Sequence, residues 1–228
     1  MRIIFVRHGH PNYELDCLTP LGHRHAAAAA LRLQDEGIEK IFSSTCGRAW
    51  ETASHTAKAL SLPVEECPFM REIGWGTKEG APLFRDGHPW DTADQMVLAN
   101  LPLYQPDQLL QEPHCRNIAR DYVEKIAADS DAFLESLGFQ REGHYYRCLG
   151  QRYETVAAFG HGGASAAQFS RIMNLPFLYV CCCMPINYTG ITVISLENKP
   201  GQLVTPKVEL YNDARHIQNM QTQNIFNR

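Results

Sequence analysis

Two histidines in glycine-rich surroundings are the first residues of this sequence that could do chemistry. His8 follows an arginine and precedes a glycine, and His161 lies between two glycines. A neutral imidazole is a competent nucleophile, and a neighbouring glycine lets the backbone approach a ligand closely. The pattern predicts a site in which one histidine attacks a ligand that lies against the backbone.

Two arginines could supply the positive charge of such a site. Arg7 directly precedes the first histidine, and Arg48 lies where the first turn of a helix is expected. A planar guanidinium donates paired, charge-assisted hydrogen bonds to phosphate oxygens, and a helix N-terminus adds free N–H groups. The residues predicted to hold a phosphoryl group are Arg7, Arg48, His161 and Gly162. The alternative for Arg48 is a surface ion pair with Glu51.

A carboxyl group is needed to complete the chemistry. The leaving oxygen of a phosphate ester requires a proton, and the same group could later deprotonate an attacking water. Glu72 follows the third expected strand and is the candidate, with Glu65, Glu66 and Glu79 nearby. An exposed carboxylate is the ordinary role of each of these residues. The choice of Glu72 depends on the motif described below.

Pairs of histidines two residues apart raise the alternative of a metal site. The histidines concerned are His8 with His10 and His23 with His25, together with His55. This spacing places two side chains on one face only in a strand, and the second pair falls at the beginning of a helix. We expect no metal ligands here. His10 is predicted to line the rim of the pocket and contact substrate, a solvent-facing side chain being the alternative.

Strands and helices that alternate along the chain must position these residues. Strands are predicted over 2–6, 38–42, 62–67, 144–148, 155–159, 189–196 and 203–211. Helices are predicted from the N-cap Thr19 to Gly37, over 46–60 with a cap among 43–45, over 118–137, and over 162–173. The alternation predicts an open α/β sheet with helices on both faces. Ligands of such sheets bind beyond the carboxyl ends of the strands, where the candidate segments could converge.

An irregular stretch from about 84 to 113 interrupts this pattern. It is rich in Pro, Gly, Asp and Gln, and a loop of this length is usually a lid or a binding segment. Its aromatic residues Trp90 and Tyr104 could shape a pocket or simply pack. We therefore predict a single domain over 1–228 with a lid inserted at about 81–150.

Composition limits the classes of function. The chain has 228 residues, a net charge of −4 and no Lys/Arg-rich stretch, so no nucleic-acid footprint is visible. No apolar run reaches the roughly 20 residues needed to cross a bilayer, and residues 3–6 are too short for a signal-peptide core. The eight cysteines form no CxxC pair. They are expected to be reduced thiols in a cytoplasmic protein, with the run Cys181–Cys183 either apolar filler or a redox sensor.

Four motifs occur in the order of a known family. They are Arg7-His8-Gly9, the segment from Ser43-Ser44 through Arg48-Ala49 to Glu51-Thr52-Ala53, Glu72 with Gly76 and Glu79-Gly80, and His161-Gly162-Gly163. Together they resemble the histidine phosphatase superfamily, the phosphoglycerate-mutase-like branch (branch 1). The segment Leu18–Gly22 resembles that family's entry into its first helix. The resemblance is spread across residues 1–80 and 153–211.

The resemblance implies more than the residues alone. It implies that His8 is the phosphorylated nucleophile, that Arg7, Arg48 and His161 hold the phosphoryl group, and that Glu72 is the proton donor. It also implies a three-layer α/β/α sandwich with a mostly parallel sheet and one antiparallel strand, a variable lid, and chemistry that needs neither a metal ion nor a cofactor.

The sequence departs from the family's mutases immediately after the first motif. Mutases usually continue with Glu-Ser and then Trp-Asn, whereas this chain has His10 to Glu14, and Glu14 takes the place of a phosphate-contacting asparagine. Hydrolysis of a small phosphorylated metabolite is therefore favoured. The alternatives are a phosphoglycerate-type mutase, a metal-dependent hydrolase built on the paired histidines, and a non-catalytic module that binds phosphorylated ligands. Neither the substrate nor the oligomeric state can be predicted from the sequence.

Overall fold

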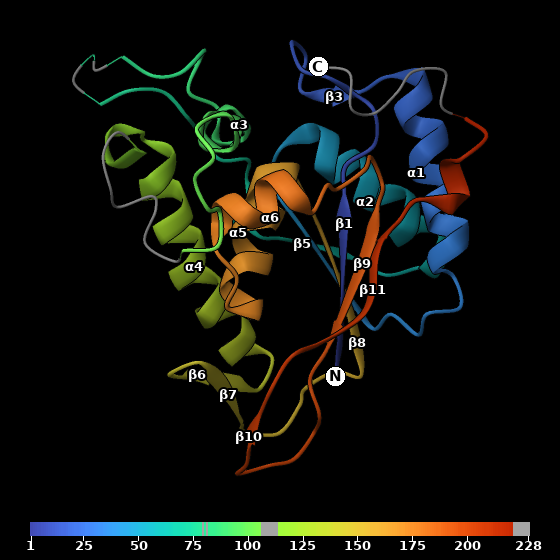
Figure 1. The fold of residues 1–228 in the computed structure, drawn as a ribbon. Helices are drawn as coiled ribbons and strands as arrows, with labels where there is room; N and C mark the ends of the chain where they lie inside the picture. The colour runs from blue at the N-terminus through green and yellow to red at the C-terminus, as the bar shows by residue number, and fades with distance from the viewer. Residues whose placement is uncertain (79, 81, 106–113, 221–228) are drawn as a thin grey trace. The chain divides into compact units, whose positions relative to one another are not determined.

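The computed structural model describes residues 1–78, 80, 82–105 and 114–220 (Figure 1). The chain forms two compact units. Unit 1 contains the described residues of Met1–Arg71, Leu134–Gly162 and Ile186–Arg228, and unit 2 those of Glu72–Phe133 and Gly163–Pro185. The predicted single domain with a lid over 81–150 stays a prediction; residues 134–150 of that range belong to unit 1.

A six-stranded sheet is the centre of unit 1. Its strands are β11 (Lys207–Asp213), β9 (Ile191–Ser195), β1 (Arg2–Arg7), β8 (Thr155–Gly160), β4 (Lys40–Ser43) and β5 (Val64–Glu66), in that spatial order. The pairs β1–β8, β8–β4 and β4–β5 are parallel, whereas β9 runs antiparallel to both β1 and β11. The predicted α/β class, with a mostly parallel sheet and one antiparallel strand, is confirmed.

The central strands are buried along their length. The side chains of Ile3 to Val6 and all six residues of β8 are buried. Parallel strands covered on both faces require such continuous apolar runs. The core cluster around them contains Ile4, Val6, Leu33, Ile38, Ile41, Ala53, Ala57, Ala157, Phe159, Ile191 and Val193. The buried strands therefore fix where the polar residues at their carboxyl ends must lie.

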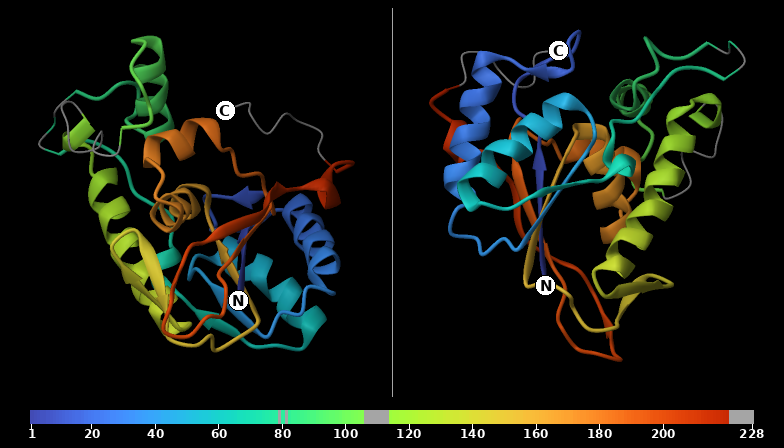
Figure 2. Two further views of the ribbon diagram at one scale, coloured as in Figure 1. Left: turned by 60° about the horizontal axis from the view of Figure 1, so that its bottom comes forward. Right: turned by 180° about the vertical axis from the view of Figure 1, so that it is seen from behind.

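Helices α1 (Pro20–Leu33) and α2 (Gly47–Leu60) pack against each other in unit 1 (Figure 2). Thr19 caps α1 as predicted, because its hydroxyl accepts the N–H of Gly22 at 3.1 Å. The predicted end at Gly37 was wrong: α1 ends at Leu33, and Gly37 lies beyond a turn with a φ of 68°. The cap of α2 was also misplaced, since the N-cap residue is Cys46 and has no side-chain cap bond.

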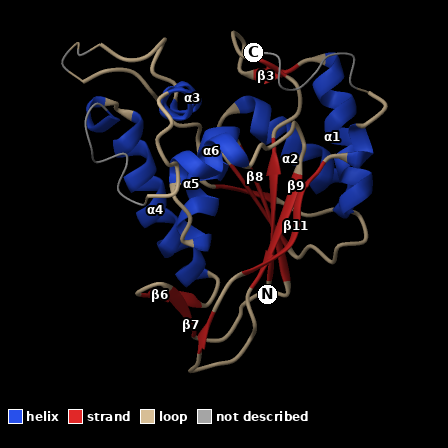
Figure 3. Cartoon of the chain, viewed as in Figure 1, coloured by secondary structure: helices blue, strands red, loops and turns tan. Residues whose placement is uncertain are grey.

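Two small sheets complete unit 1 (Figure 3). One has the order β10 (Leu203–Val204), β7 (Tyr145–Cys148) and β6 (Phe139–Glu142), and the other pairs β2 (Pro11–Asn12) with β3 (Cys17–Leu18). The predicted strand over 203–211 is divided into β10 and β11 around Pro206, which has no N–H for a ladder bond. Short 3₁₀ turns lie at Pro68–Met70 and Arg215–Ile217.

Unit 2 is helical. It contains α3 (Pro89–Leu98), most of α4 (Ala119–Ser136), α5 (Gly162–Met173) after its first residue, and α6 (Phe177–Cys183), with a 3₁₀ turn at His114–Arg116. The expectation of an irregular stretch was wrong for α3, which packs against α6 and begins after the N-cap His88. The remainder of that stretch over 106–113 lies outside the described residues.

The cysteine run lies on α6, a helix that the sequence did not predict. Cys181 is buried, in keeping with apolar packing, whereas Cys183 is exposed. None of the eight cysteines, all within the described part of the chain, forms a disulfide. Within the same part, no helix combines the length and apolar character needed to span a membrane.

Candidate active site

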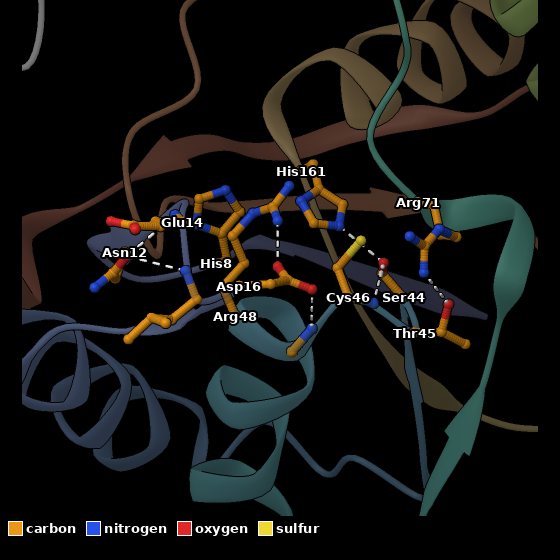
Figure 4. A network of polar contacts seen from close by, with 12 residues as sticks. His8, Asn12, Glu14, Asp16, Ser44, Thr45, Cys46, Arg48, Arg71 and His161 are labelled. Atoms are coloured by element: carbon orange, nitrogen blue, oxygen red, sulfur yellow. Dashed lines mark hydrogen bonds and ion pairs between the residues drawn. The ribbon is translucent and has the colours of Figure 1, made fainter.

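The candidate site of unit 1 lies at the carboxyl ends of three adjacent strands. Arg7 ends β1, Gly160 ends β8 and Ser43 ends β4, and these strands are neighbours in the sheet. The backbone N–H of His8 donates to the carbonyl of Gly160 at 2.9 Å. The topology thus brings together the segments that carry the predicted phosphate-binding residues (Figure 4).

His8 is buried, and the geometry fixes which of its ring nitrogens can react. Its Nδ1 lies 2.7 Å from the carbonyl oxygen of Gly9. A carbonyl can only accept a hydrogen bond, so Nδ1 carries the proton and Nε2 keeps its lone pair. Burial first, and then the positive guanidinium groups of Arg7 and Arg48, hold the pKa of His8 well below its usual value. The imidazole is therefore neutral, with the lone pair of Nε2 available.

His161 lies against His8, with 5.2 Å between the ring centroids. Its Nε2 is 2.8 Å from the hydroxyl of Ser44, and its Nδ1 has no hydrogen-bond partner among the described residues. Burial and the nearby guanidinium groups of Arg48, Arg7 and Arg71 lower the pKa of His161 to about 2. A neutral ring in this position can present one N–H to an anion.

Arg7 is held on one edge by the protein itself. Its terminal Nη1 donates to the carbonyl of Ile186 at 2.6 Å, and its guanidinium lies 4.6 Å from the centroid of the Tyr188 ring. Its Nε is buried and has no partner among the described residues. The Nε–H of a fixed guanidinium is thus available to another acceptor.

Arg48 is held in a similar way, but by a residue that the sequence did not point to. Its Nη1 pairs with the carboxylate of Asp16, whose other oxygen accepts the N–H of Gly47 at 2.8 Å. Asp16 adopts a left-handed φ of 49° to reach this position. Glu51, the expected alternative partner, instead accepts the N–H of Leu18 at 2.6 Å. Because Asp16 and Arg48 meet only through the fold, no local sequence pattern could have revealed the pair.

Three buried nitrogen atoms of the candidate site therefore lack a partner among the described residues. They are the Nε atoms of Arg7 and Arg48 and the Nδ1 of His161. A buried polar group without a hydrogen bond costs about 1–3 kcal/mol, so such groups need a structural or functional reason. The guanidinium donors around a neutral imidazole suit the binding of an anion.

Two tyrosines that the sequence did not single out also surround His8. The ring centroids of Tyr13 and Tyr188 lie 6.4 Å and 5.8 Å from that of His8. The guanidinium of Arg48 lies 5.4 Å from the centroid of the Tyr13 ring. Each arginine of the site thus stacks on one tyrosine, and the stacking limits how its side chain can move.

His10 is half-buried beside this cluster. Its Nδ1 lies 3.0 Å from the hydroxyl of Thr19, and its ring centroid is 5.5 Å from that of Tyr188. Its contact with substrate stays a prediction. Gly162 lies next to the guanidinium of Arg7: a Cβ added there would be 3.6 Å from Nε, an ordinary contact distance.

Glu72 is the first residue of unit 2, where it caps a helix. Its carboxylate accepts the N–H groups of Gly163 at 3.3 Å and Ala164 at 2.9 Å, at the N-terminus of α5. A Cβ on Gly163 would lie 2.8 Å from the carboxylate and 2.7 Å from Ile73, which explains the glycine. Trp75, three residues after Glu72, has its ring centroid 4.2 Å from that of His88.

The neighbouring carboxylates have other surroundings. Glu65 pairs with Lys40, Glu66 is exposed, and Glu79 lies outside the described residues. Glu14 is exposed, and its N–H donates to the side chain of Asn12 at 3.1 Å. Glu72 is therefore the one among the described candidates Glu65, Glu66 and Glu72 whose carboxylate is fixed by backbone N–H groups.

The paired histidines diverge at α1, as expected from their spacing. The side chain of His23 is half-exposed and its Nδ1 lies 3.2 Å from the Nε2 of His55, whereas His25 is buried. Within residues 1–78, 80, 82–105 and 114–220, no three His, Cys, Asp or Glu side chains are grouped as a metal would require.

Comparison with known proteins identifies the family. The family model described as the histidine phosphatase superfamily (branch 1) matches residues 3–129 of this chain. The chain belongs to this superfamily. The resemblance seen in the four sequence motifs is thereby confirmed.

One relative of this member of the superfamily is the probable phosphoglycerate mutase GpmB of Yersinia enterocolitica. It is 32% identical over 92 residues, which cover 36% of this chain and 43% of the relative. The chain thus matches less than half the length of that protein. GpmB of Yersinia pestis strain Pestoides F matches to the same extent.

Several solved structures share the fold of this chain. A structure described as mycobacterial hydrolase 1 has a TM-score of 0.65 and 23% identity, over 93% of this chain and 98% of its own. Mycobacterial glucosyl-3-phosphoglycerate phosphatase has a TM-score of 0.63 and 23% identity, over 92% and 98%. Phosphoserine phosphatase of Entamoeba histolytica, in complex with 3-phosphoglyceric acid, has a TM-score of 0.62 and 19% identity, over 95% and 98%.

Proposed function

We propose that this member of the histidine phosphatase superfamily hydrolyses a small phosphorylated metabolite through a phosphohistidine on His8. The observation that carries the proposal is the set of three buried, unpartnered donors on Arg7, Arg48 and His161. A phosphoryl group offers them three oxygens with delocalised negative charge. The same cluster keeps His8 neutral with its Nε2 lone pair available.

The first step would transfer the phosphoryl group to the enzyme. Nε2 of His8 attacks phosphorus as the bond to the ester oxygen breaks, and the protonated carboxyl of Glu72 gives its proton to the leaving oxygen. Arg7, Arg48 and His161 balance the charge on the phosphoryl oxygens. Most of the rate enhancement would come from this fixed positioning and charge.

The second step would return the enzyme to its starting state. The Glu72 carboxylate takes a proton from water, the water oxygen attacks phosphorus, and the bond from phosphorus to Nε2 of His8 breaks. Inorganic phosphate leaves and Glu72 is protonated again. Support for Glu72 comes from its fixed carboxylate at α5, a helix whose first residue follows His161 in the chain. Neither step uses a metal ion or an organic cofactor.

The names of similar proteins favour small phosphorylated metabolites as substrates. Two of the solved structures are called phosphatases of glucosyl-3-phosphoglycerate and of phosphoserine. Both compounds are phosphomonoesters that carry a carboxylate. We propose this class as the first to test, without assigning one compound.

A phosphoglycerate-type mutase is the second candidate, because the curated relatives are named probable phosphoglycerate mutases. A mutase would return the phosphoryl group to substrate rather than to water. It would need a bisphosphorylated primer and would form more isomer than free phosphate. The change from the mutase pattern at His10 to Glu14 favours hydrolysis.

The test is phosphate release from a panel of phosphomonoesters in the presence of EDTA, by wild type and His8→Ala. We expect release that resists EDTA and disappears in the variant, with His55→Ala, a half-exposed histidine of α2, as the matched control. Release that EDTA abolishes, or that survives in His8→Ala, would overturn the proposal. Isomer formation in excess of phosphate would favour the mutase.

A further inference from the structure

Ser44 joins the candidate site to the backbone of unit 1. It directly follows β4 and is fully buried. Its hydroxyl lies 2.8 Å from Nε2 of His161 and accepts the N–H of Cys46 at 3.2 Å. These contacts place one serine oxygen between a helix N-terminus and an imidazole of the site.

The position of this hydroxyl is fixed from several sides. The Ser44 N–H donates to the carbonyl of Phe159 at 2.9 Å, and the Ser44 carbonyl accepts the hydroxyl of Ser43 at 3.0 Å. The backbone on both sides of the hydroxyl is therefore tied down. From this fixed position, the hydroxyl oxygen forms hydrogen bonds with both Cys46 and His161.

The number of hydrogen bonds that a hydroxyl can donate and accept determines which of Ser44 and His161 is the donor. A serine hydroxyl has one proton to donate and two lone pairs that accept. One lone pair already takes the N–H of Cys46. If the hydroxyl proton is donated to Nε2 of His161, each group is satisfied, and the single proton of the neutral ring must then lie on Nδ1.

We propose that Ser44 is a positioning residue that fixes the tautomer of His161, so that Nδ1–H is directed at the phosphoryl oxygens. The inference rests on the proposed function, because it assigns to His161 the task of donating to an anion. Nδ1 is buried and has no partner among the described residues, so it is the atom left to meet the ligand.

The opposite tautomer would work against the site. With the proton on Nε2, the ring would donate to Ser44, and the hydroxyl proton would lose its acceptor at His161. A lone pair on Nδ1 would then face the oxygens of a phosphoryl group, and two acceptors repel each other. The lowered pKa of His161, caused by burial and the arginines, restricts the free enzyme to a neutral ring.

Nitrogen NMR of the intact protein tests the tautomer directly. Protein labelled with ¹⁵N-histidine would be compared with and without inorganic phosphate, using His161→Asn to assign the signals. We expect a protonated, pyrrole-type Nδ1 and an unprotonated, pyridine-type Nε2 at His161. A pyridine-type Nδ1, or protonation of both nitrogens, would overturn the inference even if the enzyme is an active phosphatase.

Variants at Ser44 test the consequence. Ser44→Ala should lower kcat by roughly 10–100-fold, as loss of a partner that orients a site histidine does elsewhere, and should shift the His161 signals towards a mixture of tautomers. Ser44→Thr keeps the hydroxyl and should restore both. Thr56→Val removes a buried hydroxyl of α2 that has no hydrogen-bond partner among the described residues, and it is the control for stability, with its His161 signals unchanged.

The outcomes separate the two proposals. A Ser44→Ala variant with wild-type kcat and wild-type His161 signals would refute the positioning role and leave the phosphatase proposal standing. Absence of phosphate release by wild type would refute the phosphatase proposal, while the nitrogen signals would still decide the tautomer.

Discussion

In unit 1, the residues expected to bind a phosphoryl group follow the ends of buried parallel strands. In unit 2, by contrast, Glu72 and its neighbours are fixed by hydrogen bonds between side chains and the backbone. Arg7 and His161 stand at the ends of β1 and β8, whose register is set by continuous apolar burial. Glu72 depends on two N–H groups of α5 and on a glycine.

The difference shows how each region tolerates change. A strand end is positioned by many buried contacts, so a substitution at Arg7 or His161 should remove a hydrogen-bond donor of the site and leave the backbone in place. In unit 2 a single side chain carries much of the local structure. Asn117 is the clearest case: it donates to the carbonyl of Gly87 at 2.6 Å and accepts the N–H groups of Gly76 and Ala119.

The largest effect is expected from the acid. Glu72→Gln keeps the shape of the side chain but removes the group that gives and takes the proton. We expect roughly a 10²–10⁴-fold loss of kcat on alkyl phosphates. With p-nitrophenyl phosphate, whose leaving group needs no proton, the variant should phosphorylate itself at a rate much closer to that of wild type. Equal losses of that rate on both substrates would assign Glu72 a purely structural role.

The next largest effect is expected at Arg48, one of the phosphate-binding residues predicted in unit 1. Arg48→Lys retains a positive charge but loses the guanidinium that Asp16 holds and whose Nε remains unpartnered. We expect kcat to fall by roughly 10²–10³-fold, as when one fixed donor to a transition state is removed. The melting temperature of the variant serves as the check on folding. Unchanged kcat would remove Arg48 from the site.

Acid should destabilise the protein through the buried histidines of unit 1. The pKa of His161 is about 2 in the folded protein, against 6.5 for the unfolded chain. Below pH 6.5 the unfolded chain therefore takes up the proton first, and stability falls as pH falls. Between pH 6.5 and 4.5 this contributes a loss on the order of 2 kcal/mol, which urea unfolding of wild type against His161→Asn would measure. Parallel curves for the two proteins would contradict the burial of a neutral ring.

The smallest effect tests unit 2. Asn117→Ala removes the hydrogen bonds to the N–H groups of Gly76 and Ala119 and to the carbonyl of Gly87. It should lower the free energy of unfolding by about 1–3 kcal/mol. Gln95→Ala, a half-exposed polar residue of α3, is the control. Denaturant unfolding of the two variants decides between them. Similar values would show that Asn117 is not the structural link that its bonds indicate.

The sequence predicted unit 1 better than unit 2 for physical reasons. Apolar runs such as residues 3–6 and the Thr19-Pro20 signal are local, and they located strands and the beginning of α1. Pro82, Gly87 and Pro89 made this part of the chain look irregular and concealed α3, which packs against α6. A helix without a local cap, such as α2, was also misread at its beginning.

The candidate site shows the same limit. Its charged motif residues could be found from sequence because arginine and histidine beside glycine indicate anion chemistry. Asp16, Ser44 and the two tyrosines could not be assigned, because each acts through a partner that only the fold brings near. Asp16 reaches Arg48 across 32 positions, and Ser44 reaches His161 across 117.

Trapping the covalent intermediate tests the central claim most directly. Wild-type protein would be mixed with a phosphomonoester that it hydrolyses and quenched in alkali to preserve phosphohistidine. The site of modification would then be mapped by mass spectrometry. We expect one phosphoryl group on His8 that disappears when substrate is exhausted, and none in His8→Ala. Steady hydrolysis without modification of His8, or with the phosphoryl group on His161, would contradict it.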